Sequence, residues 1–190
     1  MILDLILKNR SYRRFDENFL LTKEELAGFV DLARLSPSSR NVQPLKYVLS
    51  WQKERNDKIF PSLAWAGYLK AWPGPDEGER PSAYIIIVGD TTVTTGFSID
   101  PGICAQSILL GAVEKGYGGC IIGTVKKEEL RQNLNISAHL EILFVIALGK
   151  PVEVVKLEKM SDSGDVKYWR DDQKVHHVPK RALEDVIVKL

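Results

Sequence analysis

The sequence is poor in the residues that bind metals or form disulfides. It has two cysteines, Cys104 and Cys120, and three histidines in 190 residues. The cysteines belong to no CxxC pair, which argues against a zinc site and against a redox motif of that type. We expect both thiols to be reduced and buried, and we predict no metal site. His176 and His177 are adjacent, so an extended chain turns their rings to opposite sides, a poor geometry for chelation.

Long apolar runs and a strong charge of one sign are also missing. No run reaches the roughly 18 residues that a membrane-spanning helix needs. The basic residues near the N-terminus follow the apolar ones, which is the reverse of a secretory signal. These features predict a cytoplasmic protein without a membrane partner. The net charge is +1, so we expect no nucleic-acid partner either. The apolar content of 44% fits a single domain, residues 1–190, with a sizeable core.

The common nucleotide-binding and catalytic motifs are absent from the sequence. It has no Walker loop and no GxGxxG run, and the glycines of "GYGGCIIG" follow a predicted helix instead of opening one. No Ser, His and Asp set stands in a recognisable motif. A chain with so little acid, base or nucleophile chemistry of its own is suited to a cofactor that carries the reactivity.

Periodicity and end signals predict both helices and strands. The clearest helix covers 21–35, because apolar residues recur at helical spacing and Thr22 forms a capping box with Glu25. The stretch "AYIIIVGD" at 83–90 is apolar on both faces, which predicts a buried strand. Further helices are expected at 1–8, 53–72, 100–118 and 126–136, and further strands at 45–51, 119–125 and 141–151.

The order of these elements predicts the fold class and a distinct tail. Strands and helices mix without strict βαβ alternation, so we predict an α+β fold with a small central sheet, mixed or antiparallel, sandwiched by helices. Between Glu153 and Arg181 apolar residues are sparse, although Tyr168 and Trp169 are large. Such a segment has too little apolar content to fold on its own subunit. We therefore expect residues 153–190 to be a C-terminal extension that packs on the partner subunit of a tail-exchanged homodimer.

The stretch "LKNRSYRRFDENFLL" near the N-terminus concentrates guanidinium groups. Arg10, Ser11, Arg13 and Arg14 lie within five positions. One interpretation is a solvated surface turn, and the other is an anion-binding site. Arginine pairs with phosphate oxygens in bidentate fashion and a serine hydroxyl adds a neutral donor, so a phosphate-bearing cofactor would explain the cluster. Arg14 precedes Phe15 and is expected to face solvent.

Several segments resemble the FMN-dependent nitroreductase family. "NRSYRRF" resembles the opening R-R-S-x-R-x-F of that family, and "SPSSRNVQPLKYVL" resembles its A-P-S-x-x-N-x-Q-P-W-x-F segment. "GICAQSILLGAVEKGYGGCIIG" is similar to its central helix and Gly-rich strand, "ILFVIALGKP" to the next strand and its G-x-P turn, and "VPKRALEDVI" to its basic C-terminal signature. Each segment is short, but together they follow the family order and span nearly the whole chain.

The resemblance implies an NAD(P)H-dependent flavin oxidoreductase. Such proteins are α+β homodimers with one FMN in each of two interface clefts. They work by a ping-pong mechanism, in which NAD(P)H reduces the flavin and a small acceptor, such as a nitro compound or a quinone, takes the electrons. The resemblance implies no catalytic side chain, and it implies FMN-binding residues from both subunits. These are Arg10, Ser11 and Lys180 or Arg181 at the phosphate, Arg13 at the ribityl or pyrimidine side, Pro37, Ser38, Ser39, Asn41 and Gln43 from the other subunit, and the backbone of Ile122 and Gly123 near flavin N5.

The sequence departs from the family pattern in two places, and other functions stay open. Asn9 stands where the family has its first arginine, and Leu45 replaces an aromatic residue. Lys70 is either a cation at the flavin pyrimidine or a solvated helix lysine. One alternative function is another enzyme on the same fold, such as a reductive dehalogenase or a flavin-destroying enzyme. The other is a flavin- or nucleotide-binding protein without turnover.

Overall fold

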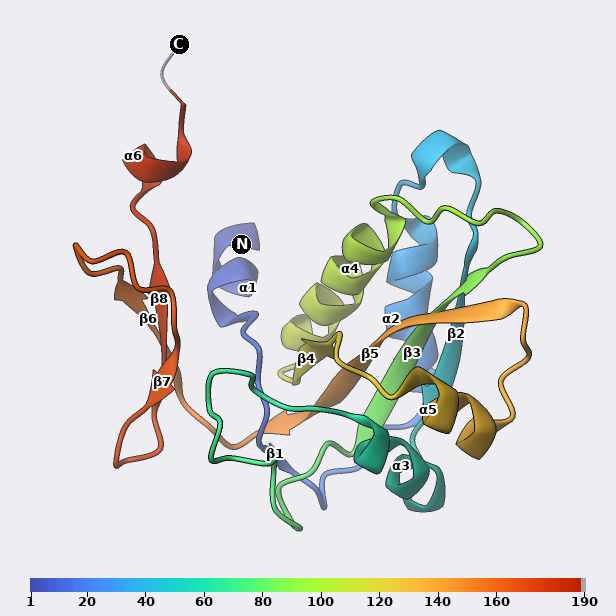
Figure 1. Cartoon of the computed structure of the whole chain (residues 1–190), viewed down its shortest axis with the longest axis horizontal. Coiled ribbons are helices and arrows are strands. Elements are labelled where there is room, and N and C mark those ends of the chain that lie inside the picture. Colours follow the sequence, from blue (N-terminus) through green and yellow to red (C-terminus); the bar gives the residue numbers. More distant parts are fainter. Residues whose placement is uncertain (189–190) are drawn as a thin grey trace.

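The computed structural model describes residues 1–188 (Figure 1), so the last two residues of the predicted 153–190 extension lie outside the described residues. The helices are α1 (Ile2–Lys8), α2 (Lys23–Leu35), α3 (Lys53–Ile59), α4 (Asp100–Glu114), α5 (Lys127–Leu134) and α6 (Leu183–Val186), with 3-10 turns η1 (Ser39–Asn41) and η2 (Phe60–Ser62). The strands are β1 (Phe15–Asp16), β2 (Leu45–Ser50), β3 (Ala83–Asp90), β4 (Gly118–Ile122), β5 (Leu140–Pro151), β6 (Val155–Lys159), β7 (Trp169–Arg170) and β8 (His176–Lys180). No helix within residues 1–188 has the length and apolar character that crossing a membrane requires.

Five strands form the central sheet, and their pairing is antiparallel throughout. The order is β1-β5-β3-β2, and β4 also pairs with β5. The long strand β5 is central, because it pairs with β3 along one edge and with β4 and then β1 along the other. The predicted α+β class with a small central sheet is confirmed, and the core sheet is antiparallel.

Helices cover both faces of the sheet, as predicted. Ile85 and Ile87 of β3 pack in one core cluster with α2 and α4, and Tyr84, Ile86 and Val88 pack in a second cluster with α3 and α5. These five side chains are at most 1% exposed. Because burying one large apolar side chain stabilises a fold by ~1.5–3 kcal/mol, burial on both faces explains the continuous apolar run of β3.

The ends of the predicted helices agree with the structure in one case and differ in another. Thr22 caps α2 and forms the expected capping box with Glu25. The expected helix over 53–72 is wrong, because α3 ends at Ile59 and the chain continues through η2 into an irregular segment. Pro61 has no N–H for a helical hydrogen bond, and Ala66 has a φ of 43° in the left-handed region.

The tail forms a second, three-stranded sheet of order β6-β8-β7, which lies apart from the central sheet in Figure 1. The tail is poor in buried apolar side chains, as its composition predicts, and its buried residues are Glu153 and His176. It nevertheless folds within its own chain, because polar and aromatic contacts hold it there. Packing of this extension on a partner subunit stays a prediction. The apolar side chains of α6, including Leu183 and Val186, are exposed and could serve such a contact.

Candidate functional site

The segment from Asn9 to Arg14, here called the arginine arm, links α1 to β1 across the edge of β4. The Tyr12 N–H donates to the Gly119 carbonyl at 3.0 Å, and Ser11 bridges to the same glycine. This approach requires glycine nearby, because a Cβ on Gly118 would lie 2.5 Å from Cδ2 of Tyr12. The Gly-rich entry into β4 therefore allows the arm to lie directly on the sheet.

A cavity of about 230 Å³ lies where the arginine arm meets the tail sheet. Its lining residues are Asn9, Arg10, Ser11, Arg13, Tyr168, His176, Val178 and Lys180. Four of them, Arg10, Ser11, Arg13 and Lys180, are residues that the sequence predicts to bind FMN. Among the described residues, the lining carries three cations and no acid, so it is suited to an anionic ligand.

Arg10 reaches this cavity with part of its guanidinium unpaired. One Nη donates to the Ile6 carbonyl at 2.6 Å, which anchors the side chain to α1. Within residues 1–188, the buried Nε has no hydrogen-bond partner. A buried donor without a partner costs about 1–3 kcal/mol, and more when it is charged. A phosphate oxygen at this position would recover that cost.

Arg13 is held in place by the tail. Its Nη1 donates to the Ser11 carbonyl at 3.2 Å and lies 3.3 Å from Nε2 of His176, while its guanidinium stacks 5.0 Å from the centre of the Tyr168 ring. Because an arginine can only donate, Nε2 of His176 must accept and the ring proton must sit on Nδ1. That buried Nδ1 has no partner within the described chain. Burial, together with Arg13 and Arg170 nearby, lowers the pKa of His176 to about 4, so the ring is neutral at neutral pH.

The side chain of Glu153, two residues beyond the end of β5, contacts both the arm and the tail. Its Oε1 accepts the backbone N–H groups of Arg13 and Arg14, the latter at 3.2 Å. Its Oε2 accepts from Arg170 at 3.2 Å, and its side chain is only 1% exposed. Arg170 in turn stacks over Trp72, at 4.5 Å from the ring centre. One carboxylate thus connects the arm to Arg170 of the tail and, through Arg170, to Trp72 in the segment that follows η2.

The prediction that Arg14 faces solvent is wrong. Its side chain is 11% exposed and forms a two-pronged ion pair with Glu79, in which Nε lies 2.5 Å from Oε2. The pair raises the pKa of Arg14, mainly through the hydrogen bond, and lowers the pKa of Glu79. The backbone of Phe15 also donates to the Glu79 carbonyl at 2.9 Å, so the loop before β3 covers this side of the arm.

The predicted flavin-contacting loop, with Pro37, Ser38, Ser39, Asn41 and Gln43, lies elsewhere in the chain. Figure 1 shows the segment between α2 and β2 at the top of the molecule, whereas the arm descends from α1 to β1 at the bottom. Within one chain the structure therefore does not bring these residues to the cavity.

The buried carboxylate of Asp100 organises this loop. Ser38 Oγ donates to Oδ2 of Asp100 at 2.5 Å, and the N–H of Ser39 donates to Oδ1 at 2.8 Å. Ser38 Oγ also accepts the N–H of Gln43 at 2.9 Å. Arg40, Asn41 and Gln43 have φ values of 51–56°, a strained conformation that these hydrogen bonds stabilise. The Ser38 hydroxyl proton is thus used inside the loop.

The remaining predicted FMN-binding residues are Ile122 and Gly123 at the end of β4 and the adjacent cations Lys180 and Arg181 of the tail. Ile122 is buried and ends β4, three residues beyond the glycine that holds the arm. Gly123 is exposed, and a Cβ built on it would meet nothing within 4 Å, so its backbone is open to a ligand. Arg181 is exposed and is not part of the cavity lining, whereas Lys180 is. The geometry favours Lys180 as the tail cation of the site.

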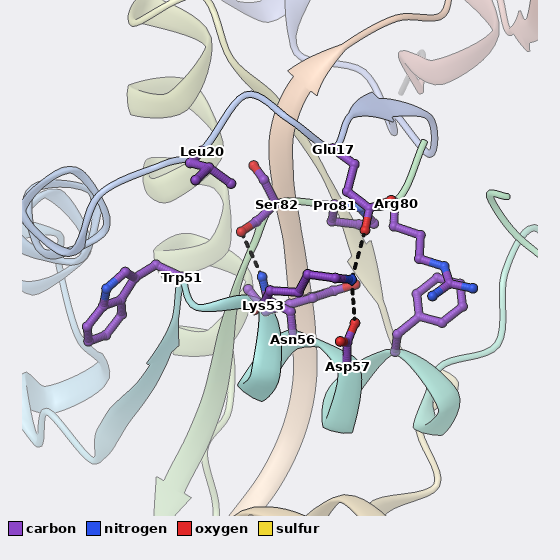
Figure 2. Close-up of a pocket in the computed structure, with 11 residues that line it drawn as sticks. Glu17, Leu20, Trp51, Lys53, Asn56, Asp57, Arg80, Pro81 and Ser82 are labelled. Atoms are coloured by element: carbon purple, nitrogen blue, oxygen red, sulfur yellow. Dashed lines mark hydrogen bonds and ion pairs between the residues drawn. The ribbon is translucent and has the colours of Figure 1, made fainter. Parts of the chain in front are cut away.

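A second cavity, shown in Figure 2, lies between α3 and the start of β3, where side chains hold these two elements together. Its volume is about 50 Å³, which is too small for a flavin but sufficient for a water molecule. Asn56 donates to the Ser82 carbonyl at 2.8 Å, and Lys53 lies between Glu17 and Asp57 at 3.5 and 3.2 Å. None of the predicted FMN-binding residues lines it.

Sequence reasoning missed three residues at the site: Tyr168, His176 and Glu153. Tyr168 stands out in the sequence as a large aromatic in a polar tail, but nothing local assigns it to the cavity. In the sequence, the pair His176 and His177 indicates only a poor metal chelator, and nothing links His176 to an arginine. Among residues 1–188, no group of three His, Cys, Asp or Glu residues is placed to hold a metal ion.

Comparison with known proteins shows which family the chain resembles. The family model "Nitroreductase family" matches residues 6–150. A Bacillus subtilis (strain 168) protein, YodC, whose name assigns it as an NAD(P)H nitroreductase, is 22% identical over 88% of this chain and 98% of its own length. An Archaeoglobus fulgidus protein, named for NADH dehydrogenase or NAD(P)H nitroreductase activity, is 24% identical over 78% of this chain and 84% of its own length.

Solved structures show the same fold. A nitroreductase family protein from Streptococcus pneumoniae TIGR4 superimposes with a TM-score of 0.70 over the full length of both chains, at 17% identity. A protein from Exiguobacterium sibiricum 255-15, named as a nitroreductase and crystallised in complex with FMN, gives a TM-score of 0.65 at 20% identity, covering 80% of this chain and 89% of that one. Because the family model covers most of the chain, this protein belongs to the nitroreductase family.

Proposed function

We propose that the protein is an FMN-dependent NAD(P)H oxidoreductase that reduces small acceptors such as nitro compounds or quinones. The observation that carries the proposal is the cavity at the arginine arm, where Arg10, Ser11, Arg13 and Lys180 converge. The family membership, the FMN complex of a protein with this fold and the NAD(P)H nitroreductase names of relatives support it.

The donors of the cavity fit a flavin mononucleotide. Arg10, with its unpaired buried Nε, Ser11 and Lys180 would hold the phosphate. Arg13 would lie at the ribityl or pyrimidine side of the same ligand. The open backbone at Gly123 would accept a planar group close to β4.

Bound FMN would supply the two-electron chemistry, and the protein would supply binding and electrostatics. Arg13 places a fixed positive charge where negative charge develops on reduction, and such a preorganised charge lowers the free energy of the reduced state. Neutral His176 accepts a hydrogen bond from Arg13 without bringing a competing charge. In this arrangement no side chain of the cavity has to donate a proton.

A second subunit would complete the site. The loop with Pro37, Ser38, Ser39, Asn41 and Gln43 lies far from the arm of its own chain, so it could line a flavin only across a dimer interface. Asp100 would then act as the residue that shapes the loop for its neighbour.

The absorbance spectrum of the purified protein tests the proposal. We expect a yellow protein that releases FMN rather than FAD on denaturation, and whose flavin bleaches on anaerobic addition of NADH or NADPH. A colourless protein that also fails to bind added FMN would contradict the cofactor assignment. A yellow protein whose flavin neither nucleotide reduces would instead indicate a flavin-binding protein without this turnover.

A further inference from the structure

Glu153 and Asp100 are the two acidic residues that are buried within the described chain. Asp100 shapes the loop after α2, and Glu153 contacts the arm and the tail. Glu153 lies two residues beyond the end of β5, and its carboxylate contacts the arginine arm with one oxygen and Arg170 of the tail with the other. Burying a carboxylate is costly unless hydrogen bonds offset the lost hydration, and Glu153 accepts three, which points to a specific role.

We propose that Glu153 is the positioning residue of the site, because its carboxylate fixes the backbone of the arginine arm and thereby aims Arg13 into the cavity. This inference rests on the proposed FMN-binding function. Glu153 does not line the cavity itself, so it would act only through Arg13 and Arg170.

The geometry of the arm shows how one carboxylate can do this. Arg13 and Arg14 are consecutive, and the backbone is turned so that both N–H groups face the same carboxylate oxygen. Glu153 Oε1 accepts both backbone N–H groups, and the two side chains then diverge, Arg13 to His176 and Arg14 to Glu79. Without this acceptor, two partly buried N–H groups would lose their partner and the arm could rotate.

The second oxygen of Glu153 connects the arm to the tail. It accepts from Arg170, whose guanidinium stacks over Trp72. Arg170 neighbours Trp169 and follows Tyr168, whose ring lies under the guanidinium of Arg13. The carboxylate also offsets part of the positive charge that Arg13, Arg14 and Arg170 concentrate here, which favours an ordered site before an anionic ligand arrives.

Two replacements separate hydrogen bonding from charge. Glu153→Ala removes both acceptor oxygens, so we expect the FMN dissociation constant to rise by about tenfold or more. Glu153→Gln keeps one acceptor oxygen for the arm but removes the negative charge beside Arg13. Its amide NH2 then faces Arg170 in place of an acceptor, so we expect FMN binding weaker than in the wild type but tighter than in Glu153→Ala, and a shift of the flavin midpoint potential to a more positive value. Glu114→Gln, at an exposed site on α4, is the matched control and should change neither quantity.

Hydrogen exchange on the apoprotein gives a readout that needs no flavin. The amides of Arg13 and Arg14 should exchange at least about tenfold faster in Glu153→Ala than in the wild type, with Glu153→Gln close to the wild type. If Glu153→Ala does not fold, the FMN affinities of Arg170→Met and Glu153→Gln test the positioning role instead, and wild-type affinity in both would overturn it. Arg170→Met removes the tail connection while the arm keeps its acceptor, and we expect weaker FMN binding.

The outcomes distinguish this inference from the proposed function. A folded Glu153→Ala protein with wild-type FMN affinity, or with unchanged exchange at Arg13 and Arg14, overturns the positioning role. So does a loss of thermal stability with no change in FMN affinity or midpoint potential, because that result describes a merely structural residue. A wild-type protein that binds no FMN overturns the proposed function itself, whatever the exchange measurement shows.

Discussion

Nη1 of Arg13 lies 3.3 Å from Nε2 of His176, although 163 positions separate the two residues in the sequence. The contact brings the N-terminal arm and the last tail strand to one cavity. Within residues 1–188, the guanidinium of Arg13 has no acidic partner, since its neighbours are a neutral ring, a carbonyl and the Tyr168 ring. The positive charge of Arg13 thus remains available to a ligand.

Replacing Arg13 with alanine should weaken FMN binding. Losing a hydrogen bond that involves a charged group costs about 1.5–3 kcal/mol, which corresponds to a dissociation constant about one to two powers of ten larger. Titration of apoprotein with FMN, followed by flavin fluorescence, measures the change. The control is Arg55→Ala on α3, because Arg55 is exposed and donates to the Leu49 carbonyl at 3.2 Å, away from the cavity. Equal effects of the two replacements would show that Arg13 does not contact the flavin.

Arg14 is unsuitable as that control and supports a prediction of its own. Its two-pronged pair with Glu79 is largely shielded, so Arg14→Ala should lower the free energy of unfolding by about 1.5–3 kcal/mol. The pair lowers the pKa of Glu79, so its contribution is present at neutral pH and is lost as the pH falls through that lowered pKa. Urea denaturation of the two proteins measures the difference. Lys53→Ala, at an exposed ion pair, should cost clearly less than Arg14→Ala, and a similar cost for both would refute the assignment.

The adjacent histidines His176 and His177 should give the tail opposite responses to pH. Hydrogen bonds to Glu158 and then Asp171 raise the pKa of His177, so its stabilising effect is complete below pH 6.5 and is lost as the pH rises through the raised pKa. Burial lowers the pKa of His176 to about 4, with Arg13 and Arg170 adding to the effect. Its contribution is therefore present above pH 6.5 and declines as the pH falls towards 4. The tail sheet should be most stable near pH 6.5.

Amide exchange of residues 155–180, corrected for intrinsic rates, measures this profile between pH 5 and 8.5. His177→Gln should flatten the alkaline side, and His176→Gln should flatten the acid side. His139→Gln, at an exposed position, should leave both sides unchanged. A profile that is the same in all four proteins would mean that neither ring is coupled to the folding of the tail.

Much of the fold follows from local patterns in the sequence. The apolar run of 83–90 and the capping box at Thr22 each predict an element that the structure contains. The helix expected over 53–72 fails where local signals conflict. Pro61 interrupts the periodic pattern, and the segment beyond it is held by a distant bridge between Leu63 and Val125.

The site could be predicted only in part, because its key contacts join distant positions. Family resemblance and the density of arginines identify Arg10, Ser11 and Arg13, but no local pattern reveals their partners. Glu153 contacts the arm across 140 positions. Arg14 was assigned to solvent because its partner, Glu79, lies 65 positions away in a loop. Burial of a charged side chain depends on such a partner, which the order of residues does not show.

The exposed apolar residues at the end of the tail predict a contact with a partner subunit. Because the proposed FMN site also needs a second subunit, we expect FMN binding and dimerisation to be coupled. Leu183 is 71% and Val188 80% exposed, and Ile2 and Leu3 of α1 are 65% and 60% exposed. Such residues at both ends of a chain favour burial against a partner. Removing residues 153–190 would also delete Glu153, so a truncation after Arg181 is the cleaner test, because it keeps the arm and its contacts.

We expect this truncated protein to dissociate at a concentration at least about tenfold higher than the full chain and to lose FMN affinity in parallel. The reason is mass action: a ligand that binds only the assembled site stabilises it, by about 2.7 kcal/mol at a hundredfold excess over its dissociation constant. Added FMN should therefore shift both proteins towards the dimer and raise the melting temperature of the full chain. Sedimentation velocity across a dilution series, with and without FMN, measures this. If monomeric protein keeps FMN tightly bound, the whole site lies within one subunit, and the loop around Ser38 and Asn41 has another role.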